Sequence, residues 1–275
     1  MSSDDSKRQA DAPDAPDAKK PKPAPAAIYD DIAVDYAAVR ANPFKRHVDV
    51  EEATFLRAVG DVAGKGVLDL ACGTGHYARL LKARGAENVH GVDNSEELLK
   101  EARRHESADG VTYYRHDLIE GPPPKPLFQP DIAIASWLLP YASNFNELLE
   151  FCEAAAVNLE SGGRFVGITT LFTDFIAGRV CTTGGGKIET DPLTRSLHWE
   201  SHPHDGMEAT VSIFTEDRQT RATFPNHLWS KRSVERALEA SGFEKISWVP
   251  LAADGAPDTE ESYEELVGVF TARLA

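Results

Sequence analysis

The stretch Val67-Leu68-Asp69-Leu70-Ala71-Cys72-Gly73-Thr74-Gly75 determines how the rest of the chain is interpreted. It predicts a short apolar strand that ends in an acidic residue, then a tight turn, and then a helix that opens at His76. Glycines at 73 and 75 let the backbone turn sharply and let a ligand lie against bare peptide groups. The stretch therefore predicts a nucleotide site at the end of a strand in an α/β fold.

Two kinds of nucleotide site share this shape. Gly73, Gly75 and Ala78 satisfy the dinucleotide fingerprint G-x-G-x-x-G/A, in which a pyrophosphate sits on the helix N-terminus. Asp69 argues against that use, because its carboxylate would repel a pyrophosphate and attract a ligand with a cationic head. S-adenosylmethionine carries a sulfonium, an ammonium and no phosphate. The stretch resembles the first motif of the class I S-adenosylmethionine-dependent methyltransferases.

The chain beyond this stretch alternates predicted strands and helices. Strands are expected at 66–71, 88–93, 111–116, 131–136 and 164–170, with helices at 75–84, 95–104 and 145–159. Paired antiparallel strands are expected at 208–215 and 218–224, followed by a helix at 231–241 and strands at 243–249 and 264–273. We therefore predict an α/β fold: a doubly wound, seven-stranded, mostly parallel sheet with an antiparallel terminal strand and an antiparallel β insert. The resemblance implies the same order of elements.

The chain divides into a tail and one domain. Residues 1–26 repeat Asp-Ala-Pro and hold almost no apolar side chains, so we expect a disordered tail. Residues 27–275 form the expected methyltransferase domain, with N-terminal lid helices at 27–60 and a substrate-roofing insert at 171–229. Two basic clusters in the tail also fit the spacing of a nuclear import signal, so nuclear import is the alternative to a cytoplasmic location.

Composition limits the partners of the chain. The 275 residues carry a formal net charge of −15, which disfavours nonspecific binding to nucleic acid or to anionic membranes. No segment is long and apolar enough to span a bilayer. The three cysteines follow no metal-ligand spacing and suit a reducing compartment. We expect a small-molecule acceptor as partner, with no nucleic acid and no membrane, and we leave the oligomeric state open.

Four strand ends carry the residues expected to bind the cofactor. The carboxyl ends of parallel strands meet at one edge of a sheet, so residues that follow different strands should converge there. Asp93 ends the second strand and can accept both ribose hydroxyls. By resemblance, Asp117 takes the adenine amino group and Leu118 lies against the ring. The residues expected at these strand ends are Asp69, Ala71, Gly73, Gly75, Asp93, Asn94, Asp117, Leu118 and Ser136.

The segment Tyr29–Tyr36 resembles the lid helix of small-molecule methyltransferases. In that helix tyrosines and a following arginine reach the methionine carboxylate, which here implies Tyr29, Tyr36 and Arg40. Simple amphipathic packing is the alternative. With residues 42–46 and 51–56, the segment is most similar to methyltransferases of the toxoflavin-synthesis type, a likeness that ends near residue 170.

Histidines and aromatic residues supply the candidates for the acceptor site. A base that removes a proton from the acceptor would assist transfer. The candidates are His47, His198, His202, His204 and His227, and the candidate walls for a planar acceptor are Trp137, Tyr141, Trp199 and Trp229. The spacing of His198, His202 and His204 could also suit zinc. Pro203 breaks a helix between them, and methyl transfer needs no metal, so we expect no metal site.

The pattern as a whole predicts S-adenosylmethionine-dependent methyl transfer to a nitrogen or oxygen of a small molecule, by in-line displacement. The alternative is a regulatory partner protein that binds S-adenosylmethionine without turnover.

Overall fold

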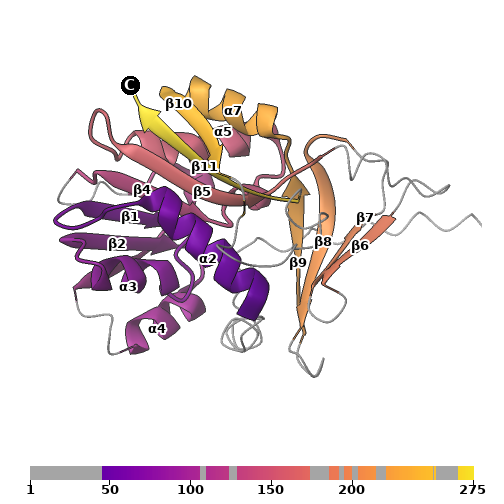
Figure 1. The fold of residues 1–275 in the computed structure, drawn as a ribbon, viewed down its shortest axis with the longest axis horizontal. Helices are drawn as coiled ribbons and strands as arrows, with labels where there is room; N and C mark the ends of the chain where they lie inside the picture. The colour runs from indigo at the N-terminus through magenta and orange to yellow at the C-terminus, as the bar shows by residue number, and fades with distance from the viewer. Residues whose placement is uncertain are drawn as a thin grey trace, which may run out of the picture.

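The computed structural model describes residues 45–105, 110–123, 129–173, 186–191, 195–199, 204–214, 221–249, 251 and 266–275. They form a large sheet covered by helices on both faces and a smaller antiparallel sheet beside it (Figure 1). None of the helices in these ranges is long and apolar enough to cross a membrane.

The large sheet has seven strands in the order β10-β11-β5-β4-β1-β2-β3. They are β1 (Gly66–Leu70), β2 (Asn88–Asp93), β3 (Val111–Arg115), β4 (Ile132–Ser136), β5 (Arg164–Thr170), β10 (Phe243–Val249) and β11 (Val267–Leu274). Strands β1 to β5 are parallel, whereas β11 is antiparallel to both of its neighbours, β5 and β10. The strand order reverses between β1 and β4, where such sheets hold ligands. The predicted fold class is confirmed.

Helices cover the two faces of this sheet because side chains alternate along each strand. Val67 and Ile134 pack toward α2 (Lys45–Val59), α3 (His76–Ala83) and α4 (Glu96–Arg104). Leu68 and Ala133 pack toward α5 (Phe145–Ala156) and α7 (Lys231–Ala240). Phe55 is fully buried in the first of these cores, so α2, which belongs to the predicted lid segment 27–60, packs one face against it.

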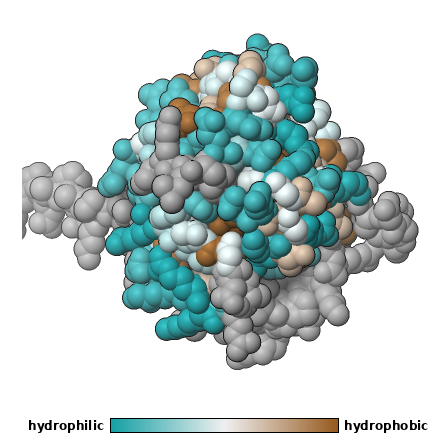
Figure 2. Space-filling view, turned by 90° about the vertical axis from the view of Figure 1, so that its left-hand side faces the viewer, coloured by the Kyte–Doolittle hydropathy of each residue, from teal (hydrophilic) through white to brown (hydrophobic). Residues whose placement is uncertain are grey.

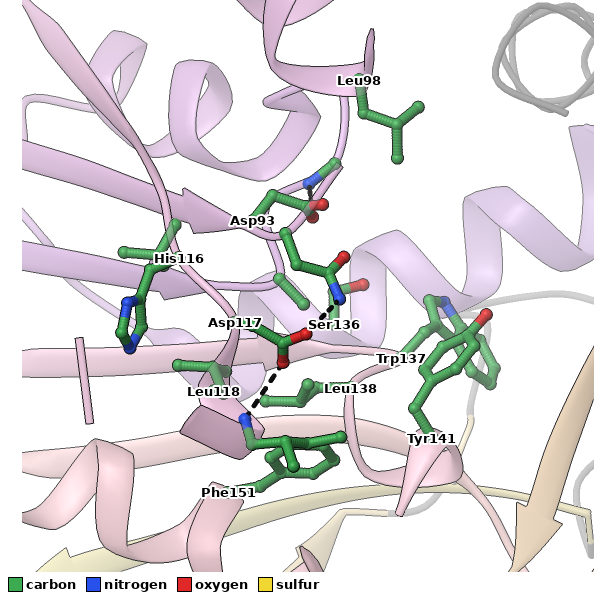
Figure 3. Close-up of a pocket in the computed structure, with 15 residues that line it drawn as sticks. Asp93, Leu98, His116, Asp117, Leu118, Ser136, Trp137, Leu138, Tyr141 and Phe151 are labelled. Atoms are coloured by element: carbon green, nitrogen blue, oxygen red, sulfur yellow. Dashed lines mark hydrogen bonds between the residues drawn. The ribbon is translucent and has the colours of Figure 1, made fainter. Parts of the chain in front are cut away.

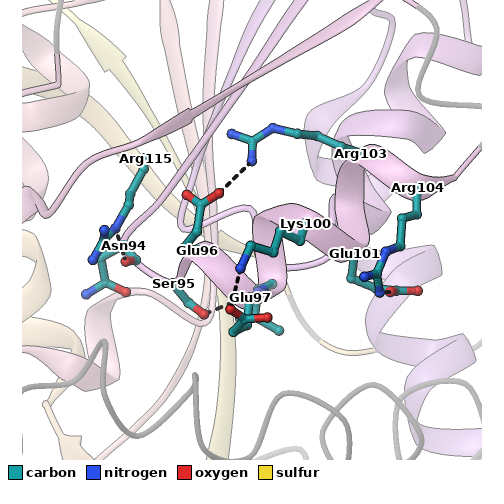
Figure 4. A network of polar contacts seen from close by, with 10 residues as sticks. Asn94, Ser95, Glu96, Glu97, Lys100, Glu101, Arg103, Arg104 and Arg115 are labelled. Carbon is teal, nitrogen blue, oxygen red and sulfur yellow. Dashed lines mark hydrogen bonds and ion pairs between the residues drawn. The ribbon is translucent and has the colours of Figure 1, made fainter.

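Helix α4 follows β2 and begins as the sequence predicts. The Ser95 hydroxyl accepts a hydrogen bond from the Leu98 amide at 3.2 Å, and acidic residues occupy the first turn. Ion pairs join Glu96 to Arg103 at 3.2 Å and Glu97 to Lys100 at 2.6 Å along its surface (Figure 4). Such exposed pairs contribute at most about 1 kcal/mol each.

The smaller sheet, which we call the accessory sheet, contains β6 (Gly186–Asp191), β7 (Arg195–Trp199), β8 (Met207–Phe214) and β9 (Arg221–Leu228). All three pairings are antiparallel. The predicted hairpin corresponds to β8 and β9, but β6 and β7 were not predicted. Their sequences, GKIETD and RSLHW, are short and contain few apolar residues, so the strand signal is weak.

The accessory sheet is joined to the large sheet through Trp229. Leu171 and Trp229 form an isolated parallel bridge, and the Phe172 amide donates to the Trp229 carbonyl at 3.0 Å. The indole Nε1 of Trp229 donates to the Ala142 carbonyl at 3.0 Å. On the side of the molecule shown in Figure 2, the described surface is mostly hydrophilic with small scattered apolar spots.

Candidate active site

A pocket lies at the carboxyl ends of β1, β2, β3 and β4 (Figure 3). About 720 Å³ of space in and around it is not filled by atoms, and part of this space is open solvent. Its lining residues are Ala71, Gly73, Val92, Asp93, Asn94, Leu98, His116, Asp117, Leu118, Ile119, Ser136, Trp137, Leu138, Tyr141 and Phe151. The topology thus brings together residues that follow four different strands.

The two glycines of the turn after β1 have different surroundings. Both adopt the left-handed conformation, with φ of 54° at Gly73 and 75° at Gly75. A Cβ atom on Gly73 would meet nothing closer than Leu98 Cδ1 at 4.0 Å, so this residue borders open space. A Cβ atom on Gly75 would clash with the Tyr113 hydroxyl. Gly73 thus lines the pocket, whereas Gly75 leaves room for Tyr113 and is not among the lining residues, so contact of Gly75 with a ligand remains a prediction.

Asp93 connects the turn to helix α4. Its Oδ2 accepts a hydrogen bond from the Gly73 amide at 2.8 Å, and its Oδ1 accepts one from the Ser95 amide at 2.9 Å. The side chain is 8% exposed and borders the pocket. Asp93 thus places a hydrogen-bond-accepting carboxylate at the border of the pocket.

Asp117 follows β3 and caps the short 3₁₀ helix η2 (Leu118–Glu120). Its Oδ1 accepts from the Ile119 amide at 3.1 Å, and its Oδ2 accepts from the Asn94 side-chain amide at 3.4 Å. Leu118 is buried directly beside it. This corner of the pocket pairs hydrogen-bond acceptors with an apolar wall, which suits a heteroaromatic ring that carries an amino group.

Two non-glycine residues of the pocket have strained backbones. Ala71 after β1 has φ of 61°, and Trp137 after β4 has φ of 64°. The Trp137 amide donates to the Ile168 carbonyl at 3.0 Å, which holds the turn against β5. Left-handed conformations of such residues cost roughly 1–2 kcal/mol each and tend to cluster at ligand sites.

Asp69 lies beneath the glycine turn, away from the pocket wall. It is 1% exposed, and its Oδ1 has no hydrogen-bond partner. Burial raises the pKa of this carboxyl well above its usual range, the neighbouring Asp93 charge raises it further, and a backbone hydrogen bond from Ala78 opposes them. The expected role of Asp69 at the cofactor remains a prediction.

The described histidine candidates lie in or beside the accessory sheet. His198 on β7 and His204 before β8 are exposed, His227 on β9 is half-buried, and none of the three lines the pocket. The histidine that does line it is His116, whose Nε2 lies 2.9 Å from the Gly121 carbonyl oxygen.

Of the four aromatic residues predicted to contact the acceptor, two line the pocket and two do not. Trp137 and Tyr141 line the pocket and lie near each other in the view of Figure 3. Trp199 is 1% exposed in the core of the accessory sheet, and Trp229 is buried against η3 (Leu139–Tyr141) and α5. Trp199 and Trp229 therefore serve packing, which corrects their assignment as acceptor walls.

Several candidates lie outside the described residues, namely Tyr29, Tyr36, Arg40 and His202, as does the side chain of His47. The pocket also contains apolar residues that the sequence analysis did not single out: Val92, Leu98, Ile119, Leu138 and Phe151. Phe151 lies three residues after Leu148 on the buried face of α5, and that spacing was available in the sequence.

Residues 67–163 match a protein family described as a methyltransferase domain. An uncharacterized protein of Haemophilus influenzae is 35% identical over 118 residues, which is 42% of this chain and 46% of that protein. A ubiquinone biosynthesis O-methyltransferase of Neisseria meningitidis is 39% identical over 59 residues, 22% of this chain and 25% of the relative. The chain thus spans less than half the length of these curated relatives.

Solved structures show the same fold. An S-adenosylmethionine-dependent methyltransferase from Mesorhizobium loti aligns with a TM-score of 0.58 at 23% identity, over 82% of this chain and 97% of that one. The calicheamicin-biosynthesis enzyme CalS10 of Micromonospora echinaspora, an amino pentose methyltransferase solved with its cofactor, aligns with a TM-score of 0.56 at 19% identity, over 88% of this chain and 97% of the other. Residues 67–163 are therefore similar in sequence to a methyltransferase domain, and the chain shares the fold of these S-adenosylmethionine-dependent methyltransferases.

Proposed function

We propose that this chain transfers the methyl group of S-adenosylmethionine to a nitrogen or oxygen atom of a small molecule. The observation that carries the proposal is the convergence of separate sequence motifs in one pocket. Its lining includes seven residues that strand-end patterns predict as cofactor ligands: Ala71, Gly73, Asp93, Asn94, Asp117, Leu118 and Ser136.

The pocket residues fit this cofactor in chemistry. Gly73 borders open space, so a methionine moiety could lie against its backbone. Asp93 offers carboxylate acceptors to the ribose hydroxyls, while Asp117 and Leu118 offer an acceptor and an apolar surface to adenine. When bound, the cofactor supplies a methyl group that its sulfonium already activates.

The contribution of the protein is then to position the reactants and to exclude water. We assign Trp137 and Tyr141 to the acceptor, because both line the pocket beyond the end of β4. The candidate bases His198, His204 and His227 do not line the pocket, so none of these three is supported as a general base. His47 and His202 remain candidates for a base, and Tyr29, Tyr36 and Arg40 remain candidates for the methionine carboxylate.

The relatives support a small-molecule acceptor, since they include a ubiquinone biosynthesis O-methyltransferase and an amino pentose methyltransferase. The toxoflavin-type likeness, a cytoplasmic or nuclear location, and the roles of segments 1–26, 27–60 and 171–229 are further parts of this proposal. The alternative, a partner protein that binds the cofactor without turnover, has no specific feature of the described residues in its favour.

Turnover separates the two functions. The protein is incubated with methyl-labelled S-adenosylmethionine and a small-molecule cell extract, and labelled products are identified by mass. Wild type should label at least one small molecule, and Asp93→Ala should not. Cofactor binding without any labelled product would favour the regulatory alternative, and absence of cofactor binding would contradict both.

A further inference from the structure

Tyr141 contacts the pocket and the accessory sheet at the same time. It lies in η3, is half-buried, and lines the pocket beyond the end of β4. It also packs against the core of the accessory sheet, where the ring of Phe224 on β9 lies 6.5 Å from its own ring between centroids, with the planes tilted by 32°. Tyr141 is therefore a pocket residue through which the accessory sheet can affect the site.

A second contact from the accessory sheet holds the end of the same short helix. The indole Nε1 of Trp229, just after β9, donates to the carbonyl of Ala142 at 3.0 Å, next to Tyr141. Gly206 leaves room for this indole, since a Cβ atom there would clash with its ring. Strand β9 itself packs on η3 and is the accessory strand nearest the large sheet in Figure 1. Trp229 thus anchors the backbone beside Tyr141, while Phe224 contacts the Tyr141 side chain.

The contact between Phe224 and Tyr141 is suited to orient a side chain. Aromatic rings with centroids about 4.5–7 Å apart attract each other in preferred orientations. Phe224 is buried and does not line the pocket, so it would act on a ligand through the Tyr141 ring. A ring held in one orientation gives an acceptor a fixed wall, and correct placement of the two reactants lowers the barrier to transfer.

We propose that Phe224 is a positioning residue for the acceptor side of the pocket: it holds the Tyr141 ring in place for an acceptor that presents an apolar or aromatic face. The accessory sheet then contributes to acceptor recognition through Phe224 and not through its histidines. The inference rests on the proposed function, because it takes Tyr141 to border the acceptor.

The test measures label transfer from methyl-labelled S-adenosylmethionine at saturating cofactor, with a small-molecule cell extract added in a dilution series. The extract concentration that gives half the maximal rate represents the KM for the acceptor. The key variant is Phe224→Leu, which keeps an apolar side chain and removes the ring. Met207→Leu is the matched control, because Met207 is buried in the same core, on the neighbouring strand β8. Calorimetry with S-adenosylhomocysteine measures cofactor affinity separately.

Phe224→Leu should raise the half-saturating extract concentration about 3- to 10-fold, as expected for the loss of an aromatic pair, and should leave the affinity for S-adenosylhomocysteine unchanged. Met207→Leu should match wild type in both measurements. Tyr141→Leu should raise the half-saturating concentration at least as much as Phe224→Leu. The double variant should then behave like Tyr141→Leu alone, because the ring that Phe224 holds is already gone.

Four results would overturn this inference and leave the proposed function standing. They are an unchanged half-saturating concentration in Phe224→Leu, an equal rise in Met207→Leu, additive effects in the double variant, and an equal loss of affinity for S-adenosylhomocysteine. A wild-type protein that binds S-adenosylhomocysteine but labels no component of the extract would instead overturn the proposed transfer, and with it the assignment of Tyr141 to the acceptor.

Discussion

The carboxyl edge of the large sheet and the accessory sheet both hold concentrations of polar and aromatic residues, but only one of them builds the pocket. At the sheet edge, residues scattered from 71 to 151 in sequence lie around a single cavity. In the accessory region, His198, Trp199 and His204 are close in sequence and yet point to different surroundings. Convergence of strand ends is therefore a better guide to a site than local density of reactive residue types.

Two aspartates allow this comparison to be tested directly. Asp93 accepts amide hydrogen bonds at the start of α4, and Asp205 does so at the start of α7, from the Ser230 amide at 2.6 Å. We expect Asp93→Ala to weaken S-adenosylhomocysteine binding by more than about 100-fold, because it removes ribose acceptors and releases the Gly73 amide.

Asp205→Ala is the matched control for that variant. It should lower the free energy of unfolding by about 1–3 kcal/mol, because its carboxylate also holds the Ser230 and Ser233 hydroxyls. Its ligand affinity should stay at the wild-type value. Calorimetry measures the ligand affinity of both variants, and chemical denaturation measures their free energy of unfolding. Equal ligand affinities would contradict the assignment of the cofactor site to the edge of the large sheet.

A glycine variant tests whether the cofactor lies against the backbone of the turn after β1. Gly73→Ala should weaken cofactor binding by roughly 10- to 100-fold, because the added methyl group enters the pocket where the ligand must approach closely. Gly162→Ala is its control: φ is 76°, a Cβ atom meets nothing within 4 Å, and the residue does not line the pocket. Both variants carry similar backbone strain, so equal affinities would mean that the ligand does not lie against Gly73.

An Asp69→Asn variant tests whether the buried carboxyl of Asp69 lowers the stability of the fold at high pH. Since burial raises its pKa, the folded state binds this proton more tightly than the unfolded state, and stability falls as pH rises above the unfolded pKa. Asp69→Asn should therefore raise the melting temperature at pH 8 and give little gain at pH 4, as measured by calorimetric scans. A lower melting temperature than wild type at pH 8 would contradict this reading.

A smaller effect on stability is expected at Ala71, whose backbone conformation is strained. Ala71→Gly should stabilise the fold by about 1 kcal/mol, because glycine adopts φ of 61° without steric cost. Ala83→Gly, at the exposed end of α3, should instead lose stability. Urea denaturation compares the two, and a loss of stability in Ala71→Gly would show that the turn is not strained there.

The smallest effect is expected for the histidines of the accessory region. Alanine variants of His198, His204 and His227 should keep kcat and KM within about twofold of wild type, because none of the three lines the pocket. A loss of about 100-fold in kcat at saturating cofactor, in any of the three, would make that residue a base and bring the accessory sheet into the site.

The sequence predicted the large sheet and its pocket because the signals there are local and repeated. Strands β1, β4 and β5 are almost wholly buried. The residues that line the pocket lie at or just after strand ends, as Asp93 does at the end of β2 and Asp117 after β3. Topology then brings these residues together without further information from the sequence.

The sequence analysis of the accessory region was incomplete for a physical reason. Alternation along β7 places Trp199 in the core and His198 at the surface, but that strand was not recognised, so both were assigned to the acceptor. The sequence also did not show that Gly73 and Gly75 have different surroundings. That difference depends on Tyr113 of β3, which lies 38 residues beyond Gly75 in the chain.

A crystal structure of the protein with S-adenosylhomocysteine tests the central claim most directly. The account predicts that the ligand fills the pocket, with its ribose hydroxyls on Asp93, its adenine between Asp117 and Leu118, and its amino-acid part against Gly73. Ligand bound elsewhere, or a pocket that stays empty at millimolar ligand in a folded protein, would contradict it.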